Sequence, residues 1–81
     1  MTTNNLPNNY TRSLFAGKAI NAYMNVTGCD IDTAVYDLLG DILHYCDYHR
    51  IDFYDELDKG RDHYEEEVRE EREERELSSV M

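Results

Sequence analysis

The feature that most constrains the fold is a series of apolar residues spaced alternately four and three positions apart. Residues at this spacing share one face of an α-helix, whereas a half-buried strand alternates at every second residue. We therefore expect an amphipathic helix that has Asp32 as its N-cap and ends near His49 or Arg50. Its apolar face comprises Ile31, Val35, Leu38, Ile42, Tyr45 and His49, widened by Ala34, Leu39 and Cys46.

One further helix is expected on each side of this central one. The first extends from its cap, Thr11, to about Thr27, and Gly28 favours a stop there. The third follows Asp52 as its cap. Their apolar faces comprise Phe15, Ala19, Ala22, Tyr23 and Val26 in the first, and Phe53, Leu57, Gly60, Tyr64 and Val68 in the third.

Gly60 is an unusual member of the third face, because glycine costs a helix about 1 kcal/mol relative to alanine. Close approach of another helix at this position would justify that cost, and a hinge is the alternative.

The expected fold class is therefore all-α, a small three-helix bundle over residues 11–68. Residues 1–10 are polar and are expected to form a flexible arm. Residues 69–81 form a Glu/Arg-rich acidic tail, expected to be an exposed helical extension that frays before Leu77. A domain this short is marginally stable alone, which favours a homodimer.

The charge is unevenly distributed along the 81 residues. The chain holds 18 Asp and Glu against 8 Lys and Arg, a net charge of -10. Residues 1–29 contain Arg12, Lys18 and no acid, so the remaining 18 acids and 6 bases leave residues 30–81 with a charge of -12. Like-charge repulsion disfavours direct binding to nucleic acid or to an anionic membrane. The basic head could also pair with the acidic tail of a second copy.

No run of apolar residues is long enough to span a membrane, and the start of the chain does not resemble a signal peptide. Cys29 and Cys46 form neither a CxxC motif nor a disulfide framework. We therefore expect a cytoplasmic protein, with Cys46 a buried free thiol and Cys29 partly exposed in a turn.

We expect no enzyme activity, cofactor or metal. The sequence has no GxSxG motif, no evident Cys–His pair and no glycine-rich phosphate loop. A ladder of suitable metal ligands follows the second helix, but a solvated polar face is the preferred interpretation. A pH-sensitive pair of His44 and His63 would require an antiparallel hairpin of the second and third helices. The ladder consists of Asp37, Asp41, His44 and Tyr48.

The segment LLGDILHYCDYHRIDFYDEL, residues 38–57, resembles the second half of MazG-type nucleotide pyrophosphohydrolases. In that family an ELGD helix carries acidic metal ligands, and Asp41 matches the family's Asp. Leu38 replaces the Glu of the motif, and residues 1–29 lack the acids of the upstream ExxE pair. The resemblance thus implies a related helical scaffold without its magnesium site.

A longer segment, residues 37–67, resembles small proteins of bacteriophages, plasmids and prophages. The shared motifs pair a D-[LI]-x-H helix with a D-F and an R-x-H-Y element. The resemblance implies a mobile-element setting, in which small acidic proteins often act on CRISPR or restriction complexes. The matching residues are Asp41, Ile42 and His44, then Asp52 and Phe53, then Arg61, His63 and Tyr64.

Together these features predict an inhibitor that binds a host CRISPR or restriction complex by presenting a DNA-mimicking surface. Regularly spaced carboxylates would occupy a groove lined by Lys and Arg, through attraction that weakens with salt. Tyrosines would add rigid contacts. The alternative is a helical self-assembling or adaptor protein without an inhibitory role, whose apolar faces bury against another chain. The candidate partner-binding residues are Asp37, Asp41, Asp47, Tyr48, Tyr54, Asp55, Glu56, Asp58, Asp62, Glu65 and Glu66.

Overall fold

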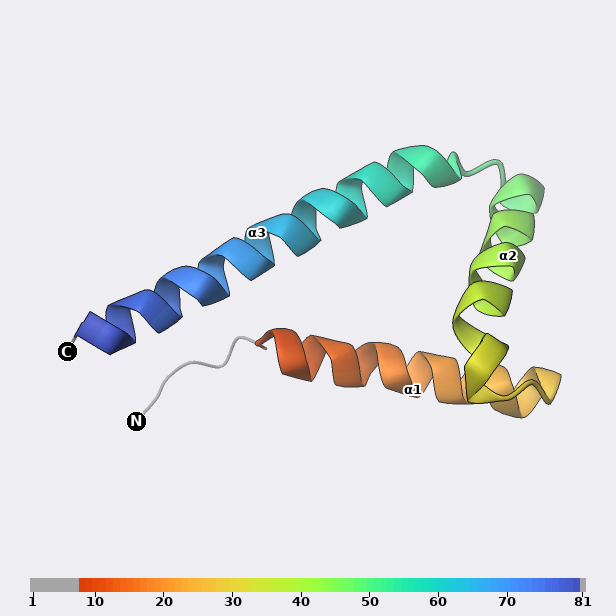
Figure 1. Ribbon diagram of the computed structural model, residues 1–81. Coiled ribbons are helices and arrows are strands. Elements are labelled where there is room, and N and C mark those ends of the chain that lie inside the picture. Colours follow the sequence, from red (N-terminus) through yellow and green to blue (C-terminus); the bar gives the residue numbers. More distant parts are fainter. Residues whose placement is uncertain (1–7, 81) are drawn as a thin grey trace.

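The computed structural model describes the backbone of residues 8–80 and the side chains of residues 8–77. It contains α1 (Asn9–Thr27), α2 (Ile31–His49) and α3 (Phe53–Val80), with no strand among the described residues. The predicted all-α, three-helix class is confirmed. The helices form the three sides of an open triangle, in which α1 and α3 converge at the end away from α2 (Figure 1). Within residues 8–80, no helix is long and apolar enough to cross a bilayer.

The first helix begins earlier than predicted. Asn8, in extended conformation, is the N-cap, and its side-chain oxygen accepts the backbone N–H of Thr11 at 2.8 Å. Thr11 is therefore not the cap, because asparagine three residues upstream already satisfies its N–H. Residues 8–10 of the predicted arm belong to this helix start, and residues 1–7 lie outside the described residues. The predicted stop at Gly28 is confirmed by its left-handed φ of 78°.

The second helix is capped by Asp30 rather than by the predicted Asp32. The Asp30 carboxylate accepts the N–H of Asp32 at 3.0 Å, and Asp32 occupies the first turn, where the helix dipole also favours an acid. The predicted end is confirmed, because Arg50 adopts the left-handed conformation with φ 58°. Asp52 then caps α3 as predicted, accepting the N–H of Asp55 at 3.1 Å.

The third helix is continuous through Gly60 and extends to Val80, so the predicted fraying before Leu77 is wrong. An ion pair at helical spacing, Glu71 with Arg75 at 3.2 Å, supports the C-terminal part of this helix. A Cβ at Gly60 would meet nothing within 4 Å. The close helix approach expected at Gly60 is therefore absent from the single chain, and the helix has no break there that would act as a hinge.

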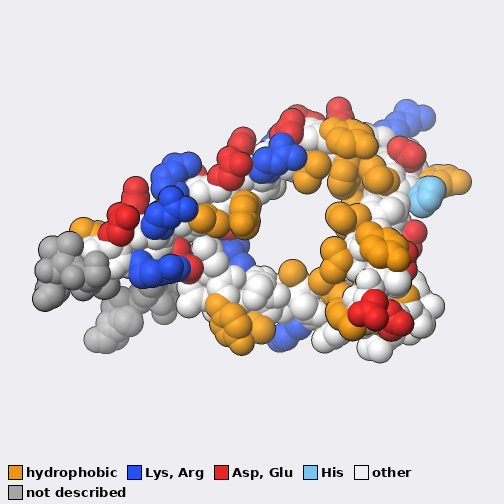
Figure 2. All heavy atoms as spheres, in the orientation of Figure 1, with side chains coloured by type: hydrophobic (Ala, Val, Ile, Leu, Met, Phe, Trp, Pro, Cys, Tyr) orange, Lys and Arg blue, Asp and Glu red, His pale blue; other side chains and the backbone are white. Residues whose placement is uncertain are grey.

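The centre of the triangle is not filled. Among the described residues, Ala34 and Cys46 are the only buried hydrophobic ones, both on α2, and the predicted burial of the Cys46 thiol is confirmed. The space-filling view shows an opening surrounded by the three helices (Figure 2). The Cα radius of gyration is 16.4 Å, whereas a compact chain of this length has about 12 Å. The 19 residues of α2, about 28 Å long, hold α1 and α3 apart at that end.

Candidate protein-binding surface

The corner between α1 and α2 combines local packing with one strong hydrogen bond. Ala34 is fully buried, and the hydroxyl of Tyr23 donates to the carboxylate of Asp41 at 2.5 Å. This hydrogen bond, with desolvation and the negative charges of Asp41 and Asp37, raises the pKa of Tyr23 from 10.0 to about 12. The neutral phenol is therefore the stable form at this corner.

The corner between α1 and α3 is polar, and we call its four residues, Asn9, Arg12, Glu67 and Glu71, the clasp. The Asn9 backbone N–H donates to Glu71 Oε1 at 3.1 Å, and Asn9 Nδ2 donates to the Glu67 carbonyl at 3.2 Å. Arg12 Nε lies 3.0 Å from Glu67 Oε2. The basic N-terminal part of the sequence thus contacts the acidic part within one chain, whereas the sequence suggested that this pairing could join two copies.

Large apolar side chains remain exposed on all three helices. Figure 2 shows hydrophobic side chains of the three helices around the central opening. Soluble monomers rarely leave so much apolar surface uncovered unless it is an interaction site. We call this set the exposed apolar residues: Tyr10, Leu14, Phe15, Val26, Ile31, Val35, Tyr36, Leu39, Tyr45, Tyr48, Ile51, Tyr54, Leu57, Tyr64 and Leu77.

This set includes members of all three apolar faces that the sequence analysis expected to form a core. Phe15, Val35 and Tyr64 are 55%, 53% and 63% exposed, while Leu38 and Ile42 are half-buried. The periodicity identified the apolar faces, but the open triangle leaves most of each face without a partner. The expectation that the single chain buries these faces is therefore wrong.

The predicted acidic surface begins on α2, where its residues differ in environment. Asp41 is engaged by Tyr23, and Asp37 is half-buried and lies close enough to act on the Tyr23 pKa. Asp47 and Tyr48 are exposed. The Asp37 and Asp41 carboxylates therefore lie near Tyr23 of α1, although Asp41 is still exposed to solvent.

On α3 the predicted acids are interrupted by bases. Lys59 Nζ lies 3.2 Å from Asp55 and 3.5 Å from Glu56, and Arg61 lies 3.5 Å from Asp58. The hydrogen bond to Asp55, aided by both carboxylate charges, raises the pKa of Lys59. The predicted acidic surface does not include these bases, although their spacing of three and four residues from the acids indicates such pairs.

The other predicted residues on this helix are exposed: Tyr54, Asp62, Glu65 and Glu66. Tyr54 also contacts Phe53 edge-on, with ring centroids 5.3 Å apart. Acidic and basic side chains alternate along the outer side of α3 (Figure 2). The structure therefore distributes the eleven predicted residues over two diverging helices and does not gather them into one uniformly negative patch.

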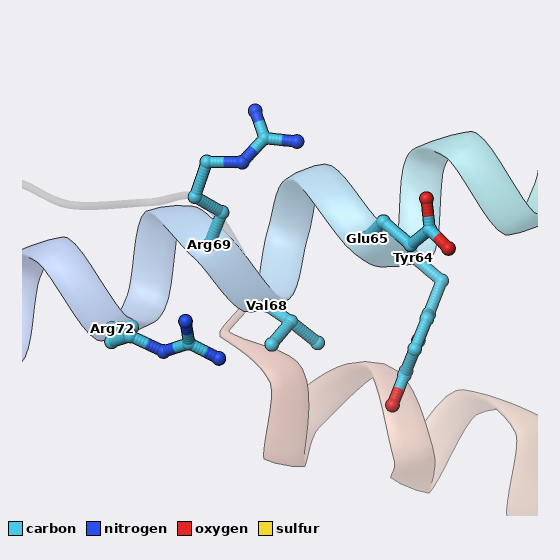
Figure 3. A pocket seen from close by; sticks show the side chains of 5 residues that line it. All are labelled: Tyr64, Glu65, Val68, Arg69 and Arg72. Atoms are coloured by element: carbon cyan, nitrogen blue, oxygen red, sulfur yellow. The ribbon is translucent and has the colours of Figure 1, made fainter.

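A shallow depression on α3 lies beside the clasp, lined by Tyr64, Glu65, Val68, Arg69 and Arg72. Figure 3 shows Tyr64 and Val68 directed toward α1, whereas Arg69 points away from it. An aromatic ring, an aliphatic group and charges of both signs suit contact with another protein better than a small anionic or cationic ligand.

Metal chemistry has no support among residues 8–80, where no three His, Cys, Asp or Glu side chains converge on a common point. The hairpin required for a His44–His63 pair is also not formed, because α2 and α3 diverge from their shared turn (Figure 1). Comparison with protein-family models, curated proteins and solved structures gave no match to this chain.

Proposed function

We propose that this protein is a helical assembly module, which binds another protein chain through the exposed apolar residues. The observation that carries this proposal is the near absence of a core: two buried hydrophobic residues against fifteen exposed large ones within the described part of the chain. A protein partner would fill the opening and cover the apolar faces that one chain leaves without contacts.

The magnitudes favour apolar contact over charge as the source of affinity. Full burial of one Val, Leu or Phe side chain contributes about 1.5–3 kcal/mol. An exposed ion pair contributes about 0.2–1 kcal/mol, and salt screens it. Covering Leu14, Phe15 and Val35 would therefore outweigh any single charge pair that the acidic residues could form.

Two matched variants test this proposal in pull-downs from a bacterial lysate. Phe15→Ser removes an exposed apolar side chain and leaves the single-chain fold intact, because Phe15 is 55% exposed. We expect its partner to be lost, while the wild-type complex survives a wash at about 1 M salt, where the Debye length is about 3 Å. Retention of every partner by Phe15→Ser would contradict the proposal.

The inhibitor predicted from the sequence is the second candidate function. It is supported by the exposed carboxylates of Asp62, Glu65 and Glu66 and by the net charge of -10. The basic residues interspersed on α3 count against it, because they break the run of negative charge. A CRISPR or restriction subunit as partner would fit this candidate.

Charge reversal separates the two candidates. The double substitution Asp62→Lys with Glu66→Lys should abolish binding if carboxylates mimic DNA, and should leave an apolar assembly nearly unchanged. Each variant thus serves as the control for the other. If only the charge-reversal variant loses its partner, and the wild-type complex elutes at moderate salt, the inhibitor is the better explanation and the assembly module is rejected.

A further inference from the structure

Within the described residues, the third helix is attached to the rest of the chain at its start and near its middle. It leaves α2 through the turn at residues 50–52 and meets α1 at the clasp, near residues 67–71 (Figure 1). Between these points, Leu57 is 39% exposed and Tyr64 is 63% exposed. By contrast, α1 and α2 share a buried residue, Ala34, and the Tyr23–Asp41 bond. The chain therefore consists of a joined α1–α2 pair and a loosely attached α3.

The turn that attaches α3 is strained. Arg50 adopts φ 58°, in a region that disfavours every residue with a Cβ, whereas the corresponding turn after α1 uses Gly28. Short connections under strain promote the exchange of an element between identical chains. Relaxing Arg50 to an ordinary conformation would swing α3 away from its own α1.

Charge determines which element of a second copy α3 can contact. Residues 53–80 hold twelve acids and five bases, a net charge of -7, so two α3 helices repel each other. Residues 9–27 hold Arg12 and Lys18 and no acid, which makes α1 the complementary helix. In a symmetric dimer, the favoured pairing is therefore α3 of each copy with α1 of the other.

The exposed area matches what such a dimer needs. The chain exposes 7079 Å², against about 5,100 Å² for a compact monomer of its mass. Covering only half of this excess on each chain would give an interface of about 2,000 Å², the size at which obligate homodimers begin.

We propose that two copies of this chain exchange α3, so that the clasp forms between chains. This inference rests on the proposed assembly function and names its partner. Asn9 and Arg12 of each copy bind Glu67 and Glu71 of the other through the same contacts that one chain makes with itself. The apolar faces of α1 and α3, including Phe15 and Leu57, then cover each other across the new interface.

A charge-swap mixing experiment tests the exchange with full-length chains. One chain carries Arg12→Glu and the other carries Glu67→Arg, and their masses are measured by light scattering and native mass spectrometry. Alone, each variant has two like-charged clasp pairs per dimer, so we expect its association to weaken about tenfold or more. In the equimolar mixture, every pair between different chains joins opposite charges, and association should return to the wild-type level.

A clasp confined to one chain behaves differently, because mixing leaves each internal pair like-charged. The chain carrying both substitutions is the folding control and should associate like the wild type. If the wild type is a dimer but mixing the Arg12→Glu and Glu67→Arg chains does not restore association, the exchange of α3 is wrong, whereas the proposed assembly function is unaffected. A wild-type chain that stays monomeric at about 100 µM, far above the dissociation constants of stable complexes, would overturn the second copy as partner. The Phe15→Ser experiment would then decide the assembly function separately.

Discussion

The two corners of α1 are built from different interactions, and the contrast explains the open shape. The α1–α2 corner joins helices adjacent in sequence, with Gly28 and Asp30 shaping the turn and Ala34 buried beneath it. The α1–α3 corner joins residues 58 and 62 positions apart in sequence through hydrogen bonds, beside the half-buried Val68. Closing such a long loop costs entropy that a few partly exposed hydrogen bonds barely offset.

A single chain therefore specifies its helices and the α1–α2 corner well, but it holds α1 and α3 together only weakly. The helix caps and the buried Ala34 methyl group at the α1–α2 corner form within one chain and require no second protein. The α1–α3 corner depends on two hydrogen bonds from Asn9 and on one ion pair that solvent screens, with the Arg12 and Glu67 side chains 48% and 26% exposed. The α1–α3 corner is therefore the contact that a second chain can most easily replace.

The largest effect on the free energy of unfolding is expected from a larger side chain at the packed α1–α2 corner. Ala34 is fully buried, so Ala34→Leu should destabilise the fold by about 1–3 kcal/mol. Urea unfolding followed by far-ultraviolet circular dichroism measures this change. The control is Ala16→Leu on the exposed side of α1, which should change stability little. Equal behaviour of both variants would mean that the corner is not packed as described.

Straining the turn at the same corner should have the next largest effect. Gly28 has φ 78°, so Gly28→Ala should cost about 1–2 kcal/mol. Gly17 lies within α1 with open space around its Cβ position, so Gly17→Ala should instead stabilise by about 0.5–1 kcal/mol. Thermal unfolding of the two variants gives opposite shifts if the turn is correctly assigned.

Relieving the backbone strain at Arg50, in the turn between α2 and α3, should increase the stability of the folded chain. Arg50→Gly removes a left-handed strain of about 1–2 kcal/mol, offset in part by the entropy of glycine, for a net gain of about 0.5–1 kcal/mol. Chemical unfolding measures the gain. A loss of stability would show that the Arg50 side chain contributes more than its backbone costs.

Weakening the clasp should have a small, salt-dependent effect. Glu67→Gln removes the ion pair with Arg12 and should cost about 0.2–1 kcal/mol at low salt and almost nothing at about 1 M salt. Glu66→Gln changes the neighbouring exposed carboxylate outside the clasp and serves as the control. Unfolding midpoints at both salt concentrations test the difference, and a salt-independent loss would contradict an electrostatic clasp.

The smallest effect is the loss, at alkaline pH only, of the stability that the Tyr23–Asp41 hydrogen bond gives the α1–α2 corner. The Tyr23 pKa is about 12 in the folded chain against 10.0 as the ordinary value. Because the folded value is higher, the stabilisation is complete below pH 10 and is lost as the pH rises toward 12. The stability difference between wild type and Tyr23→Phe should therefore be constant below pH 10 and shrink above it. Asp41→Asn should return the Tyr23 pKa, measured by NMR, toward its ordinary value.

The sequence by itself determined the three helices, because periodicity, capping residues and glycine act within a few positions. The stop at Gly28, the end near His49 and the cap at Asp52 were all predictable. The caps at Asn8 and Asp30 were missed, because several neighbouring residues can serve as a cap and sequence does not show which backbone is extended. The extension to Val80 was missed because ion-pair support is additive and individually weak.

Tertiary structure alone decided what the apolar faces contact. Ile31 and Ala34 belong to the same predicted face, yet the first is 63% exposed and the second fully buried. Likewise, Asp41 lies in a polar ladder by spacing but is bound by Tyr23 from another helix. Periodicity specifies which side of a helix is apolar, whereas burial depends on the angles between helices and on which surfaces meet. In this protein those angles leave the triangle open, and its uncovered faces are the basis for the proposed function.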